Sequence, residues 1–181
     1  MLSKLQNTSV QEGQNGGEKE DNKKSHYKPK SLRSVRRVAM DCLARREHSF
    51  FELKQKLQIK LPDKNNSEIL SELEKLREQN LQSDKRFAES FVRYRKSRGF
   101  GYLHIREDLR KRFVSEVLIS QILTDDDQDW MVMIHDIVIK RLPQTKPVRF
   151  GSIEHQKIER FLRSRGFQHF LSRKVLAKFI H

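Results

Sequence analysis

Arginine and lysine side chains gather in two zones of the sequence, each beside aromatic residues. Residues 85–112 contain ten basic and three acidic residues, and residues 149–178 contain eight and two, whereas residues 113–148 carry a net charge of −3. Guanidinium groups match the geometry of phosphate and carboxylate oxygens, and basic helix ends beside aromatic rings are suited to contact backbone phosphates. The two zones predict binding to a polyanion. For any single arginine, solvation of a helix surface is the alternative interpretation.

The whole chain is basic, with 181 residues, a formal net charge of +14 and a pI of about 10.1. This charge favours contact with nucleic acid or with an acidic protein surface, and it does not choose between them. The sequence contains no apolar run of the roughly 18 residues that a membrane span requires, and its first residues lack the apolar core of a signal peptide. We therefore expect a cytoplasmic protein without membrane association. The single cysteine, Cys42, excludes a disulfide framework and is predicted to be buried.

Motifs for catalysis and for metal binding are absent from the sequence. The seven glycines form no phosphate-binding loop of the GxxxxGK[ST] or GxGxxG type, and the histidines and the cysteine form no HExxH or CxxC pattern. The acidic run from Asp125 to Asp129 lacks the glycine and glutamate of a calcium loop, and helix capping explains it better. We expect no enzyme activity, no metal and no cofactor.

Helices must position the basic zones, because apolar residues recur at steps of three and four from residue 31 onward. Alternation typical of β-strands is hard to find. Ser49-Phe50-Phe51-Glu52 has the form of a capping box, and Leu61-Pro62 ends the helix that follows. Residues 1–30 have almost no large apolar side chains, which predicts a disordered polar tail. The predicted apolar faces comprise Val35, Val38, Ala39, Cys42 and Leu43; Leu53 and Leu57; Ile69, Leu70, Leu73 and Leu76; Phe87, Ala88, Phe91 and Tyr94; Tyr102, Ile105 and Leu109; Val114, Val117, Leu118 and Ile122; Trp130, Ile134, Ile137 and Val138; Ile158, Phe161 and Leu162; and Phe170, Leu171, Val175 and Leu176.

An internal echo divides these helices into groups. Ser97-Arg98-Gly99-Phe100 recurs as Ser164-Arg165-Gly166-Phe167, and the segment from Ala44 to Ser49 forms a comparable basic helix-end turn. The sequence thus predicts an all-α fold of three tandem three-helix repeats in an elongated, curved array. The predicted boundaries are residues 31–82, 83–124 and 125–181, with a proline-bracketed linker near 143–152.

The spaced motifs resemble those of the RecX family. The first resemblance begins at Cys42-Leu43-Ala44-Arg45-Arg46-Glu47-His48-Ser49 and continues with Glu52-Leu53 and Lys56-Leu57. The second repeat is similar through Leu81, Ser83-Asp84, Arg86-Phe87-Ala88, Arg98-Gly99-Phe100-Gly101, Ile105 and Leu109, and the third through Lys157-Ile158, Arg160-Phe161-Leu162 and Arg165-Gly166-Phe167. The resemblance extends from about residue 31 to the end of the sequence and is weakest between 125 and 151.

The resemblance implies three tandem three-helix repeats and a regulator of the recombinase RecA. Members of the family bind in the groove of the RecA–DNA filament, bridge neighbouring protomers and restrain filament growth, ATP hydrolysis and strand exchange. It implies RecA filaments as the partner, weak or filament-associated DNA contact, a monomer and no cofactor. We expect the contact residues to include Arg45, Arg93, Arg98, Arg106, Arg110, Arg163 and Arg165.

A direct DNA-binding protein that acts independently of RecA is the alternative function. The high pI and helix pairs similar to helix-turn-helix units favour it. It predicts tight binding to naked DNA with a steep dependence on salt. A DNA titration with and without RecA distinguishes the two functions.

Overall fold

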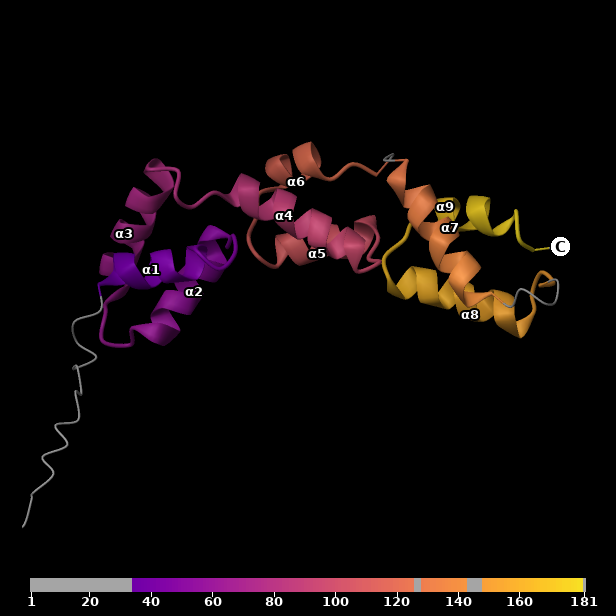
Figure 1. The fold of residues 1–181 in the computed structure, drawn as a ribbon, viewed down its shortest axis with the longest axis horizontal. Coiled ribbons are helices and arrows are strands. Elements are labelled where there is room, and N and C mark those ends of the chain that lie inside the picture. Colours follow the sequence, from indigo (N-terminus) through magenta and orange to yellow (C-terminus); the bar gives the residue numbers. More distant parts are fainter. Residues whose placement is uncertain (1–33, 126–127, 143–147, 181) are drawn as a thin grey trace, which may run out of the picture. The chain divides into compact units, whose positions relative to one another are not determined.

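The computed structural model describes residues 34–125, 128–142 and 148–180 of this chain, and the predicted tail at 1–30 lies outside them. Within these residues the fold consists of nine α-helices, with one isolated β-bridge between Val148 and Ile180 (Figure 1). The prediction of an all-α protein is confirmed. None of the described helices is long and apolar enough to cross a membrane.

The first repeat comprises helices α1 (Val35–Leu43), α2 (Phe50–Lys60) and α3 (Asn66–Glu78). All three pack against one another around a separate apolar cluster. Each helix begins at a residue whose side-chain oxygen accepts a backbone N–H three positions further on, which satisfies one otherwise unpaired donor. The buried residues of this cluster are Val35, Val38, Ala39, Cys42, Leu53, Leu57, Leu61, Ile69, Leu73 and Leu76. Cys42 is buried as predicted.

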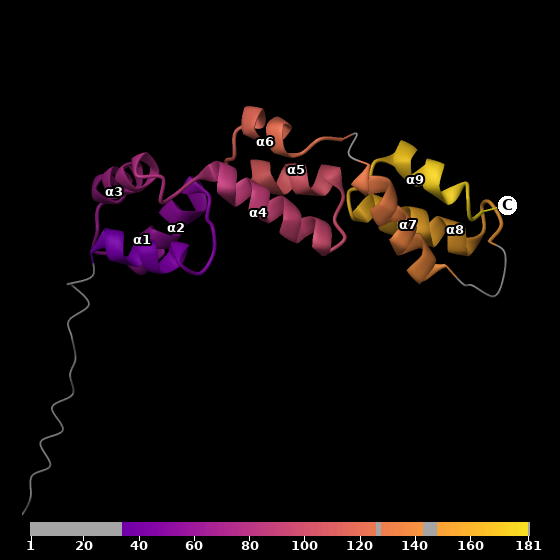
Figure 2. The ribbon, with the colours of Figure 1, turned by 45° about the horizontal axis from the view of Figure 1, so that its top comes forward.

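Six further helices form the second and third repeats, and helices α4 and α5 lie side by side in both ribbon views (Figures 1 and 2). The tandem three-helix organisation is confirmed, while the residue boundaries inferred from the sequence remain a proposal. The second repeat contains α4 (Asp84–Ser97), α5 (Tyr102–Arg110) and α6 (Glu116–Ile122), and the third contains α7 (Asp129–Arg141), α8 (Ile153–Ser164) and α9 (His169–Leu176).

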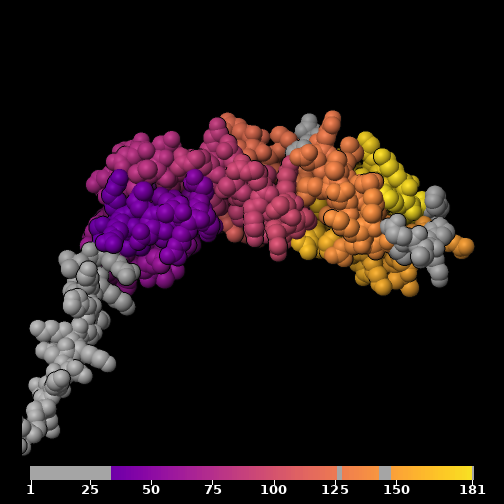
Figure 3. Space-filling model, in the orientation of Figure 1, coloured from indigo at the N-terminus to yellow at the C-terminus, as the bar shows by residue number. Residues whose placement is uncertain are grey.

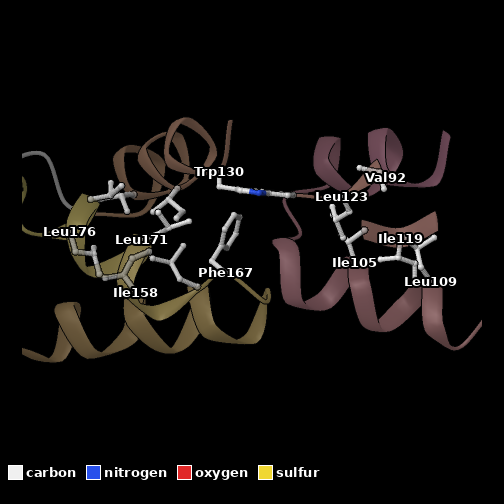
Figure 4. Packing of buried hydrophobic residues seen from close by; sticks show 14 of the residues in the cluster. Val92, Ile105, Leu109, Ile119, Leu123, Trp130, Ile158, Phe167, Leu171 and Leu176 are labelled. Carbon is white, nitrogen blue, oxygen red and sulfur yellow. The ribbon is translucent and has the colours of Figure 1, made fainter. Parts of the chain in front are cut away.

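One continuous apolar cluster joins the second and third repeats. Its largest side chain is Trp130, which is 1% exposed and whose indole N–H donates to the Thr124 carbonyl at 2.9 Å. In Figure 4, the Trp130 ring reaches from the third repeat toward Leu123, with Phe167 beside it. Because the two repeats share this cluster, neither buries its apolar surface fully without the other.

The joint between the first and second repeats is largely polar. Asp84 accepts the backbone N–H of Phe50 at 2.8 Å and thereby caps α2, while Arg86 pairs with Glu47 at 2.8 Å. One aromatic contact accompanies these bonds: the ring centroids of Phe51 and Phe113 lie 4.1 Å apart. Polar groups and a single ring pair therefore hold this joint, in contrast to the shared core of the other two repeats.

Three residues that the periodicity placed on apolar faces are exposed instead. They are Tyr94, Val117 and Phe170, with exposed fractions of 59%, 71% and 62%. In α6 the neighbouring Ile119 is buried, and the helix is too short to bury a wider face.

The predicted start of one helix also differs from the structure. Gln128, without a side-chain hydrogen bond, occupies the N-cap of α7 where an acidic cap was expected.

Candidate functional site

Two exposed residues among the predicted contact residues lie at the end of α4. Gly99 adopts a φ of +73°, and this left-handed conformation ends the helix. Residues with a Cβ rarely take it, which accounts for a glycine at this position. Arg98 is the C-cap, and Arg93 lies five residues earlier on the same helix. Both side chains are exposed and have no ion-pair partner among the described residues. They are available to an anionic partner at no cost in broken internal contacts.

Arg106 and Arg110, in contrast, share one carboxylate. Arg106 donates to Glu116 at 3.0 Å, and the Nε of Arg110 donates to the other oxygen of the same side chain. These hydrogen bonds, that of Arg110 first, lower the pKa of Glu116 from 4.5 to about 2. The three side chains form a cluster with one excess positive charge, so the two arginines offer an external anion less than their number indicates.

The two copies of the repeated Ser-Arg-Gly-Phe motif, residues 97–100 and 164–167, meet in the joint between the second and third repeats. The N–H of Gly101 donates to the Arg165 carbonyl at 2.8 Å, and that of Leu103 donates to the Gly166 carbonyl at 3.0 Å. A Cβ on Gly101 would lie 2.6 Å from the Gly166 carbonyl oxygen, so only glycine permits this approach. The space-filling view shows α4–α5 atoms touching those of the third repeat (Figure 3).

Arg165 is part of this joint as well as a predicted contact residue. Its guanidinium lies 4.7 Å from the Phe100 ring centroid and 5.1 Å from that of Phe161. The two remaining predicted residues have no side-chain hydrogen bond to Arg165 in the described part of the chain. Arg163 is exposed on α8, and Arg45 is exposed in the turn after α1. The structure thus brings together Arg106 with Arg110, and the Arg165 turn with the turn that follows Arg98.

Three further arginines, which the sequence did not single out, stack on aromatic rings. Arg112 lies 4.7 Å from the Phe91 centroid, and Arg95 lies 3.7 Å from that of Phe100. Arg141, the last residue of α7, lies 3.5 Å from the Phe161 centroid. Arg95 also lies 5.7 Å from the Phe91 centroid. These two residues are four apart on one helix, a spacing that could have indicated their contact. The contact of Arg141 depends on how α7 packs against α8.

Two of these stacked arginines already have acidic partners. Arg95 pairs with Asp108, and Arg112 pairs with Glu52 of the first repeat at 2.8 Å. Their charges are neutralised within the molecule, and Arg112 adds an ion pair to the joint between the first two repeats. For Arg141, the structure gives no carboxylate partner among the described residues.

Catalytic or metal-binding constellations do not emerge in the described ranges. No three His, Cys, Asp or Glu residues there lie close enough to hold a metal ion. The buried His48 has a structural environment: its Nδ1 lies 2.9 Å from the Arg46 carbonyl, and its Nε2 lies 3.0 Å from the Lys56 ammonium. Burial is the main cause that lowers its pKa. What the site offers chemically is cationic surface on rigid helix ends.

Comparisons with known proteins agree on one family. A family model described as "RecX, second three-helix domain" matches residues 83–123. The chain is 39% identical over 134 residues to "Regulatory protein RecX" of Pseudomonas putida (strain GB-1), covering 74% of this chain and 83% of that protein. It is 35% identical over 130 residues to the protein of that name from Mannheimia succiniciproducens, covering 71% and 83%. A crystal structure of regulatory protein RecX shares the fold, with a TM-score of 0.61 and 22% identity, covering 79% of this chain and 72% of that chain.

Proposed function

Since the chain belongs to the RecX family of regulatory proteins, we propose that it binds the RecA–DNA filament and restrains filament growth, ATP hydrolysis and strand exchange. The observation that carries this proposal is the 39% identity over 134 residues to a regulatory protein RecX. Exposed arginines of the second and third repeats that have no ion-pair partner among the described residues support it, because a nucleoprotein filament is a polyanion. Several weak contacts on linked repeats reinforce one another, which favours binding to an extended partner.

The test is an assay of RecA from the same organism on single-stranded DNA at moderate salt. We expect substoichiometric amounts of this protein to lower both the ATPase rate and strand exchange. Unchanged rates would contradict the proposal. The alternative, a DNA-binding protein independent of RecA, predicts instead that DNA affinity is the same with and without RecA.

Among the predicted contact residues, Arg93 and Arg98 give the cleanest test of where the filament binds. Both are exposed and have no ion-pair partner in the part of the chain that the structure describes, whereas changing Arg165 would also disturb the joint between repeats. We expect the double charge reversal Arg93→Glu/Arg98→Glu to weaken inhibition at least tenfold. The matched control, Arg37→Glu/Lys60→Glu, makes the same charge change at exposed positions of the first repeat. If both variants weaken inhibition equally, the loss depends on the net charge of the protein and not on contact through Arg93 and Arg98.

A further inference from the structure

Two arginines of the third repeat lie against an aromatic ring and have no acidic partner among the described residues. Arg141 lies 3.5 Å from the Phe161 centroid, and Arg165 lies 5.1 Å from it. A guanidinium that stacks through its face keeps its N–H donors at the edge, where they point away from the ring. Within the described part of the chain, neither side chain pairs with a carboxylate. Contact with the ring therefore restricts the position of both guanidinium groups before any ligand arrives.

Lys157 extends this pair into a row. Lys157, Phe161 and the C-cap Arg165 follow one another at intervals of four along α8, which places them on one helix face. At 1.5 Å per residue the row is about 12 Å long. Lys157 also lines an open hollow of about 300 Å³ with Arg141, Phe161, Leu142, Ile158 and Glu154. Glu154 is the only acidic residue in that lining, so the hollow has an excess of positive charge.

We propose that the row formed by Arg141, Lys157 and Arg165 binds the phosphates of a nucleic-acid strand. A row of about 12 Å is long enough for several phosphates of one strand to lie against its cations. Fixed arginine forks match phosphate oxygens. Because two guanidinium groups already lie over the Phe161 ring, contact runs through phosphates rather than base stacking, and base sequence matters little. This inference goes beyond the proposed function, since it requires no RecA.

The experiment measures binding of the full chain to a fluorescein-labelled oligothymidine by anisotropy over a series of salt concentrations. The test variant is Arg141→Gln/Lys157→Gln, because neither side chain takes part in the joint between repeats. The matched control is Arg160→Gln/Lys174→Gln, which removes two charges from exposed positions of the same repeat. Among the described residues, the Arg160 side chain donates to the Gln156 carbonyl of its own helix, so we expect its loss to leave the fold unchanged.

We expect the test variant to bind about a hundredfold more weakly, since each charge-assisted hydrogen bond contributes roughly a factor of ten. The slope of log affinity against log salt should become shallower by about 1.4, or about 0.7 for each lost phosphate contact. The control should keep the wild-type slope. Equal loss in both variants, or an unchanged slope in the test variant, overturns the proposal.

Two additional measurements separate this site from general charge attraction. Phe161→Leu keeps the net charge but removes the stacking platform, and we expect it to weaken binding several-fold while circular dichroism confirms the fold. Polyglutamate at equal charge concentration should not displace the oligonucleotide, and displacement would overturn the choice of phosphate. The RecA ATPase assay is run in parallel: a wild-type protein that binds the oligonucleotide without inhibiting RecA contradicts the proposed function alone.

Discussion

Replacing Gly101 with alanine tests whether close backbone contact holds the second and third repeats together. Gly101 has a φ of −89° and a ψ of 174°, a conformation that alanine adopts without strain. The added Cβ would lie 2.6 Å from both the Gly166 oxygen and the Phe167 nitrogen. These are backbone atoms, which no rotamer change can move aside. The repeats must therefore separate locally by on the order of 1 Å to reach normal contact distances.

The cost of this separation follows from the contacts that it breaks. Two backbone hydrogen bonds cross the joint at 2.8 and 3.0 Å, and each contributes about 1 kcal/mol. The stack of Arg165 on Phe100 adds roughly 0.5–1 kcal/mol. We expect Gly101→Ala to lower the free energy of unfolding by about 2–3 kcal/mol, equivalent to roughly 4–12 °C in Tm.

Urea denaturation followed by circular dichroism measures this loss, and hydrogen exchange locates it. The amide of Leu103 should lose protection, because its acceptor is the Gly166 carbonyl. The control is Gly151→Ala, since Gly151 has a φ of +77° with no atom within 4 Å of the added Cβ. It introduces backbone strain of about 1–2 kcal/mol but leaves Leu103 protected. A Gly101→Ala protein with wild-type stability and a protected Leu103 amide would refute the reasoning.

Three further predictions concern charges and packing. The pKa of Glu116 is lowered from 4.5 to about 2 by its hydrogen bonds to two arginines. These contacts stabilise the fold above pH 4.5, and the stabilisation is lost as the pH falls toward 2. An NMR titration of the Glu116 carboxyl with a midpoint near 4.5 would contradict this. His48 has a lowered pKa because it is buried and lies near Arg46 and Lys56. The unfolded chain then binds its proton more readily, so the free energy of unfolding decreases as the pH falls below 6.5, and His48→Gln should lessen this decrease. Leu73→Ala, at a fully buried position, should cost about 2–5 kcal/mol, and hydrogen exchange should detect the loss in the first repeat with the third repeat still protected.

Periodicity predicted the helices well because a buried stripe must recur every three or four residues. Leu53, Leu57 and Leu73 lie in the core as expected. The same rule failed for Val117 because several apolar side chains follow one another in α6, and which of them faces the core depends on the position of α4. A local pattern therefore indicates which residues form the apolar face of a helix, but not which other helix packs against that face.

The contact residues were less predictable than the fold. Sequence reasoning selected Arg165 from its repeated motif, and the structure places it at a joint as well as at the surface. It selected Arg106 and Arg110 without their shared partner, because Glu116 lies on the next helix. The stack of Arg141 on Phe161 brings residues 20 positions apart into contact, and no short motif carries that information.

The separate core of the first repeat has a consequence for the order of folding during synthesis. All its buried side chains, from Val35 to Leu76, precede the second repeat in the chain and are therefore synthesised before it. The second repeat shares its core with Trp130 and Phe167, so its apolar face stays uncovered until the third repeat follows. We therefore expect the nascent chain to fold in two steps, with a window of exposed apolar surface between them. A slow stretch of translation would be tolerated just after the first repeat and would favour aggregation midway through the last one.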